Sequence, residues 1–114
     1  MNPNTPQLLM QKALPAASAL LYTPPTGQGN VWTEISSIWL CNTDVAIRAL
    51  TLRYGNGTLT VLNSLFDVAP IEPKRTYIIF DGSPIKMRVG DQFFGFCDVA
   101  DKIVLSIWGA VWQG

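Results

Sequence analysis

Turn-forming residues divide this sequence into short stretches, and their regular spacing limits the possible folds more than any other feature. From residue 18 onward, Gly, Pro, Asn and Asp recur at intervals of about 8–12 residues. The stretches between them are rich in β-branched and aromatic residues, and none shows the apolar period or the cap of a helix. About eight strands are expected on this spacing. They span residues 18–23, 30–41, 45–54, 58–68, 75–80, 85–89, 92–99 and 102–112.

Short strands at this spacing are typical of an antiparallel sandwich of two sheets. The sequence therefore predicts an all-β, jelly-roll-like sandwich with about eight strands, and a small closed barrel is the alternative. The chain has 114 residues, which is enough to bury a core without a metal or a disulfide. We expect one β-sandwich domain over residues 18–114, preceded by an extended N-terminal arm over residues 1–17.

The predicted arm combines two opposing signals. Pro3, Pro6 and Pro15 argue against a central strand, because proline cannot donate a ladder hydrogen bond. The apolar run Leu8–Met10 nevertheless has little use in a free tail. We expect the arm to lay this run into a groove on a neighbouring chain, and a disordered tail is the alternative.

Charged residues are scarce. They make up 14% of the chain, against about 25% in ordinary domains. Part of the surface is therefore expected to be covered by something other than water. The net charge is zero and the densest basic cluster is the pair Lys74 and Arg75, so neither nucleic acid nor a membrane surface is an expected partner.

The residues needed for catalysis are sparse. Histidine is absent, which removes the commonest general base and metal ligand. Cys41 and Cys97 lie in apolar strands and are expected as buried thiols, although the sequence does not decide whether they form a disulfide. Asp98 and Asp101 could supply oxygen ligands to calcium, but two carboxylates are weak evidence for a site. We expect no enzyme, no cofactor and no metal.

Tryptophan is the positive signal, with four residues in the chain. Along residues 102–112, alternation places Ile103, Leu105 and Ile107 on one face and Trp108 and Trp112 on the other. The first face is expected to fill the core, and the second to meet a partner or the arm, since Trp is enriched at interfaces. The residues predicted to contact a partner are Leu8, Leu9, Met10, Trp32, Trp39, Trp108 and Trp112.

Five segments together resemble small virion proteins of tailed bacteriophages. They read ALLYTPPTGQ, ISSIWLCNT, LTLRYGNGT, NSLFDVAPIEPKRTYII and MRVGDQFFGFCDVADKIVLSIWGAVW, and they cover residues 19–112. The resemblance is one of strands and turns, with no catalytic motif. It implies a β-sandwich that assembles on the particle as capsid decoration (cement), or as a fibre, neck or tail component.

Two classes of function follow from this reading. The first is a non-enzymatic capsid decoration protein, assembled in the host cytoplasm onto the capsid surface, that bridges neighbouring coat subunits. Its partners would be the major capsid protein, other virion proteins, and copies of itself in a dimer or trimer. The alternative is a carbohydrate- or ligand-binding module on the same sandwich, with Trp rings stacking on sugars.

Overall fold

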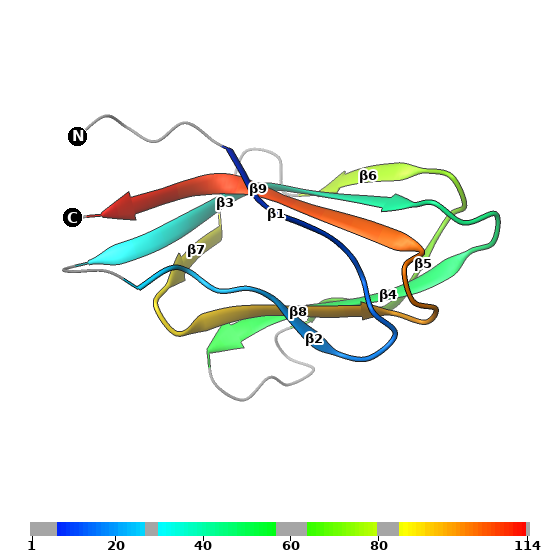
Figure 1. The fold of residues 1–114 in the computed structure, drawn as a ribbon, viewed down its shortest axis with the longest axis horizontal. Coiled ribbons are helices and arrows are strands. Elements are labelled where there is room, and N and C mark those ends of the chain that lie inside the picture. Colours follow the sequence, from blue (N-terminus) through cyan, green and yellow to red (C-terminus); the bar gives the residue numbers. More distant parts are fainter. Residues whose placement is uncertain (1–6, 27–29, 57–63, 80–84, 114) are drawn as a thin grey trace.

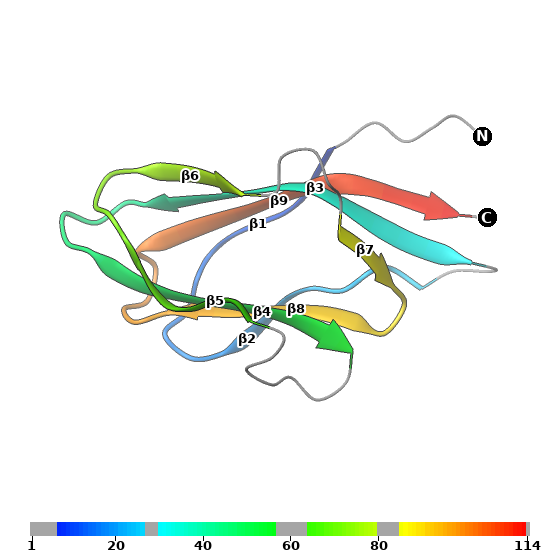
Figure 2. The same ribbon diagram turned by 180° about the vertical axis from the view of Figure 1, so that it is seen from behind.

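The computed structural model describes residues 7–26, 30–56, 64–79 and 85–113, and they form nine strands in two antiparallel sheets (Figures 1 and 2). The strands are β1 (Gln7–Ala13), β2 (Ala19–Tyr22), β3 (Val31–Asn42), β4 (Arg48–Asn56), β5 (Ser64–Ile71), β6 (Thr76–Ile79), β7 (Ile85–Arg88), β8 (Asp91–Cys97) and β9 (Ile103–Gln113). The predicted all-β sandwich is confirmed. In the described part of the chain, no helix has the length and apolar character needed to cross a membrane.

The strand order is that of a jelly roll. One sheet has the order β1-β9-β3-β6 and the other β2-β8-β4-β5. Strands β6 and β7 pair with different halves of β3, so together they fill one strand position. The eight positions then pair as nested hairpins: first with last, second with seventh, third with sixth, and fourth with fifth. A double-sheet jelly roll is built in this way.

The core fills the space between the two sheets. Its fully buried side chains come from both layers, with Ile38 and Leu105 on the first sheet facing Leu50 and Phe93 on the second. The expected core face of β9 is confirmed, because Ile103, Leu105 and Ile107 are completely buried. Cys97 lies in the same core as a free thiol, and burial raises its pKa.

The segment expected as an extended arm contributes to this chain's own sandwich. Strand β1 pairs antiparallel with β9 and forms an edge of the first sheet. Leu14, directly after β1, is fully buried and donates its backbone N–H to Ile103. The sandwich therefore includes residues from Gln7 onward. Residues 1–6 of the expected arm and residues 58–63 of an expected strand lie outside the described residues.

Candidate interaction surface

A single bulge brings the four tryptophans onto one face of the molecule. Trp32 and Trp39 are seven positions apart, so simple alternation along β3 places them on opposite faces. The register between β3 and β9 shifts between Ile35 and Ser37, and the extra residue, Ser36, restores the alternation to the same side. Both tryptophans consequently lie on the outer face of the first sheet.

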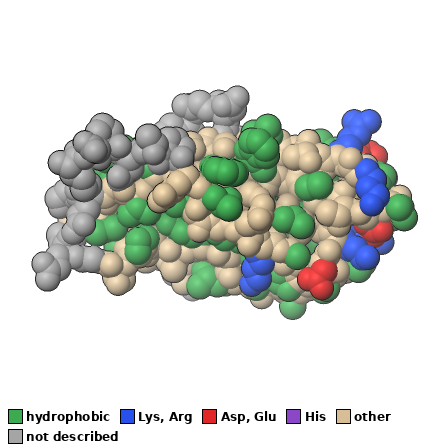
Figure 3. All heavy atoms as spheres, turned by 45° about the horizontal axis from the view of Figure 1, so that its top comes forward, with side chains coloured by type: hydrophobic (Ala, Val, Ile, Leu, Met, Phe, Trp, Pro, Cys, Tyr) green, Lys and Arg blue, Asp and Glu red, His purple; other side chains and the backbone are tan. Residues whose placement is uncertain are grey.

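Strand β9 supplies the other two tryptophans. Trp112 lies opposite Trp32, and Trp108 lies opposite Ser37, beside Trp39. Residues directly opposite in an antiparallel pair point to the same side of the sheet, so Trp108 and Trp112 also face outward. We call the outer side of the sheet formed by β1, β9, β3, β6 and β7 the tryptophan face (Figure 3). Figure 3 shows described hydrophobic side chains along this side, and most of the charged side chains visible in this view lie at the end that carries β6, away from the C-terminal end of β9.

The backbones of β3 and β9 approach closely beside the bulge. Ser36 donates its hydroxyl hydrogen to the Trp108 carbonyl at 3.2 Å. At Gly109, a Cβ atom would overlap the carbonyl of Glu34, so glycine fits here because it has no side chain. This close approach fixes the position of Trp108 relative to β3.

The tryptophans form two pairs across the strands. The rings of Trp32 and Trp112 are nearly parallel, with centroids 6.3 Å apart and an interplanar angle of 8°. Those of Trp39 and Trp108 are 6.1 Å apart and tilted by 46°. Trp39 is the most open of the four, with 42% of its surface exposed. Each pair places two large apolar rings side by side on the tryptophan face.

The indole N–H groups differ in their partners. Trp39 donates to the Ser37 hydroxyl at 3.2 Å, and Trp32 donates to the Glu34 carboxylate over a long 3.4 Å. The Nε1 atoms of Trp108 and Trp112 are buried and have no acceptor among the described residues. Within the described residues, these two rings are therefore held by contacts such as those with Trp32 and Trp39 and by no hydrogen bond of their own.

Charged groups gather at the Trp32–Trp112 end of this face. Lys86 lies opposite Glu34, and Arg88 lies opposite Trp32. The Lys86 ammonium sits 4.7 Å from the centre of the Trp32 ring, in a cation–π contact. None of these three ionised side chains is joined to another described residue by an ion pair.

The predicted docking run Leu8–Met10 is divided between two environments. Leu8 lies opposite Trp108 at the border of the tryptophan face and is 42% exposed. A register shift follows at Leu9, and both Leu9 and Met10 pack against this chain's own core. Two of the three apolar side chains therefore stabilise this sandwich, which differs from the role expected for them in a neighbour's groove.

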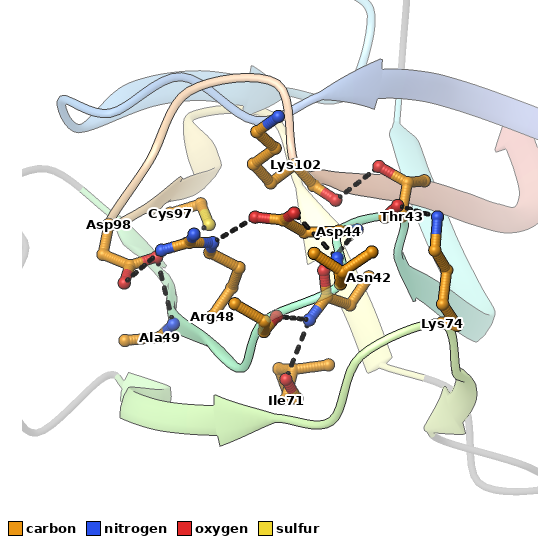
Figure 4. A network of polar contacts seen from close by, with 12 residues as sticks. Asn42, Thr43, Asp44, Arg48, Ala49, Ile71, Lys74, Cys97, Asp98 and Lys102 are labelled. Atoms are coloured by element: carbon orange, nitrogen blue, oxygen red, sulfur yellow. Dashed lines mark hydrogen bonds and ion pairs between the residues drawn. The ribbon is translucent and has the colours of Figure 1, made fainter.

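A polar network braces one end of the sandwich (Figure 4). Asn42 is fully buried and donates to the carbonyls of Ala46 and Ile71, both at 2.9 Å. Arg48 pairs with Asp44 at 2.7 Å and with Asp98 at 3.5 Å. These contacts join the β3–β4 connection to the start of the β8–β9 connection. The sequence gives no sign that Asp98 lies near Arg48 and Asp44, since Asp44 and Asp98 belong to different strand connections.

The network shifts the pKa of two carboxyl groups downward. For Asp44, the hydrogen bond from Arg48 is the main cause, followed by that from the Val45 amide. For Asp98, desolvation raises the pKa, but hydrogen bonds from Cys97 and the Ala49 amide and the charge of Arg48 outweigh it. Both carboxylates therefore stay ionised to lower pH than an ordinary aspartate. Among the described residues, no cluster of three or more His, Cys, Asp or Glu side chains could hold a metal.

Neither models of known protein families, nor curated protein sequences, nor solved structures give a match to this chain.

Proposed function

We propose that this chain is a non-enzymatic structural protein of a tailed-phage virion that decorates the capsid and stabilises it by bridging neighbouring coat subunits. The observation that carries the proposal is the gathering of all four tryptophans on one outer sheet face. Trp is enriched at the centres of protein interfaces, where it combines large apolar area with few rotamers. The resemblance of residues 19–112 to small virion proteins of tailed bacteriophages is the reason for proposing a phage capsid as the partner.

The mechanism is adhesion by burial of apolar surface. Each Å² of apolar surface removed from water contributes about 25 cal/mol before the costs of association. A face built on paired rings loses little side-chain entropy when it docks, because the tryptophans are already ordered by each other. A sandwich with this face can hold adjacent coat subunits together without turnover.

The experiment compares binding to particles of the phage that encodes the chain, assembled without it. Wild-type protein is expected to co-sediment with these particles at a fixed ratio to coat subunits. Trp39→Ser is expected to weaken binding by at least about tenfold, the effect of losing about 1.4 kcal/mol. The matched control is Leu20→Ser, because Leu20 is 44% exposed on the second sheet, and this variant should bind as wild type.

Two results would count against the proposal. One is wild-type protein that stays in the supernatant with these particles. The other is equal weakening by Trp39→Ser and Leu20→Ser, which would show that the tryptophan face is not the contact.

A carbohydrate-binding module is the second candidate, favoured by the surroundings of Trp39. This exposed ring donates to the Ser37 hydroxyl and lies opposite Ser106, whose hydroxyl accepts from Gln11 at 2.9 Å. Aromatic rings beside fixed polar groups suit sugars. Calorimetric titration with oligosaccharides in the absence of particles tests it, and saturable binding that Trp39→Ser abolishes would favour this candidate.

A further inference from the structure

Three charged groups on the tryptophan face contact the Trp32 side chain or lie opposite it, but they form no ion pair within the described residues. Glu34, Lys86 and Arg88 lie on one face, around the stacked rings of Trp32 and Trp112. Glu34 and Lys86 are direct cross-strand neighbours, yet no ion pair joins them. At the braced end of the sandwich, by contrast, Arg48 is paired with two carboxylates. Charges of both signs that do not pair with each other, beside an apolar centre, are suited to a partner with the same pattern.

We propose that the Trp32–Trp112 end of the tryptophan face binds the same end of a second copy of this chain about a two-fold axis. In such an interface each contact occurs twice, because the same surface is used by both partners. Glu34 of one copy then meets Lys86 or Arg88 of the other, and the reciprocal pair forms on the far side of the axis. The rings of Trp32 and Trp112 fill the apolar centre.

The geometry and charge of the chain fit this occupant. Apolar faces of two sheets pack about 10 Å apart, as the two sheets do inside a sandwich. The net charge is zero, so two copies do not repel each other strongly.

This inference rests on the proposed function only in taking the tryptophan face as an interaction surface. It concerns purified protein without particles, whereas the proposed function concerns binding to particles. A monomer that still co-sediments through Trp39 would overturn the dimer and leave the proposed function standing. A dimer that does not co-sediment with particles would support the dimer and count against the proposed function.

The test uses two variants with opposite charge reversals. Glu34→Lys makes all three charged groups positive, and the double variant Lys86→Glu, Arg88→Glu makes all three negative. Wild-type protein is expected to be a dimer by light scattering across a dilution series. Each variant alone is expected to dimerise at least about a hundredfold more weakly, since like charges face each other across the interface.

Mixing the two variants separates contacts between chains from contacts within one. An equimolar mixture is expected to form a heterodimer with near wild-type affinity, because the three positive groups of one variant chain meet the three negative groups of the other. A contact within one chain cannot be restored by mixing. The matched control is Glu72→Lys, the same charge change at an exposed position of the β5–β6 connection, and it should dimerise as wild type.

Four results would overturn the proposal: a wild-type monomer throughout the series, a wild-type trimer, variants that dimerise alone, or a mixture that stays monomeric. Far-ultraviolet circular dichroism and thermal unfolding of each variant show whether it is folded before its oligomeric state is compared.

Discussion

Among the described residues, charged side chains are paired at the braced end of the sandwich, around Asn42 and Arg48, and unpaired on the tryptophan face. At the braced end, Arg48 is paired with Asp44 and Asp98, and the buried Asn42 is bound to two carbonyls. On the tryptophan face, Glu34 and Lys86 lie side by side without an ion pair between them. Polar groups that bind each other hold strand connections in place, whereas Glu34 and Lys86 contact the half-buried Trp32 ring and form no ion pair within the described residues. The difference separates a region whose polar groups bind each other from the face that we propose as the interaction surface.

The largest expected effect comes from the backbone beneath the tryptophan face. Gly109→Ala should lower the free energy of unfolding by about 3 kcal/mol, because the new Cβ overlaps the rigid Glu34 carbonyl. Gly95→Ala is the control in the second sheet, where the nearest atom is the end of the Leu21 side chain, and its loss should be smaller. Urea denaturation measures both. Equal losses would show that the β3–β9 crossing is not unusually tight.

The next effect is at the braced end. Asn42→Ala should cost about 2 kcal/mol, since the buried carbonyl of Ile71 loses its donor and the Asp44 amide loses its acceptor. The exposed Asn30 provides the control, and Asn30→Ala should be close to neutral. The same denaturation experiment reports both. A neutral Asn42→Ala would mean that water replaces the network without loss.

Acid should weaken the braced end. The pKa values of Asp44 and Asp98 are lower in the folded chain than in the unfolded one. Their contribution to stability is therefore complete above the ordinary aspartate pKa, about 3.9, and is lost as the pH falls through the depressed values. Unfolding measured from neutral to acidic pH should show this loss, and Arg48→Met should reduce it. A pH dependence unchanged in Arg48→Met would remove Arg48 as its cause.

The smallest expected effect on folding is at Trp39. Trp39→Ser should lower the free energy of unfolding by about 1 kcal/mol, because this ring is 42% exposed and lies outside the core. Its effect on particle binding should be larger than its effect on stability. Thermal unfolding beside co-sedimentation compares the two, and a variant that fails to fold would place Trp39 with the structural residues.

The sequence alone predicts much of the fold. Turn residues between β-rich stretches indicate two packed sheets, and alternation in β9 assigns Ile103, Leu105 and Ile107 to the core, which is confirmed. These features are local, since they depend on backbone preferences and a period of two residues. A partner role stays a prediction for the four tryptophans, Trp32, Trp39, Trp108 and Trp112. Their number in the sequence indicates an interface, but it does not show that they lie on one face.

The tertiary structure decides which residues share a surface. A bulge at Ser36 reverses the alternation halfway along β3, and this shift gives Trp32 and Trp39 the same outward direction. Pairing of β1 with β9 turns Leu9 and Met10 toward this chain's own core, although they read as a docking segment. Bulges and long-range strand pairs depend on which strands meet, and contacts between residues far apart in the chain leave no local pattern. The chain's composition therefore predicts that tryptophans lie at its surface, and the register of its sheets decides which of them share a face.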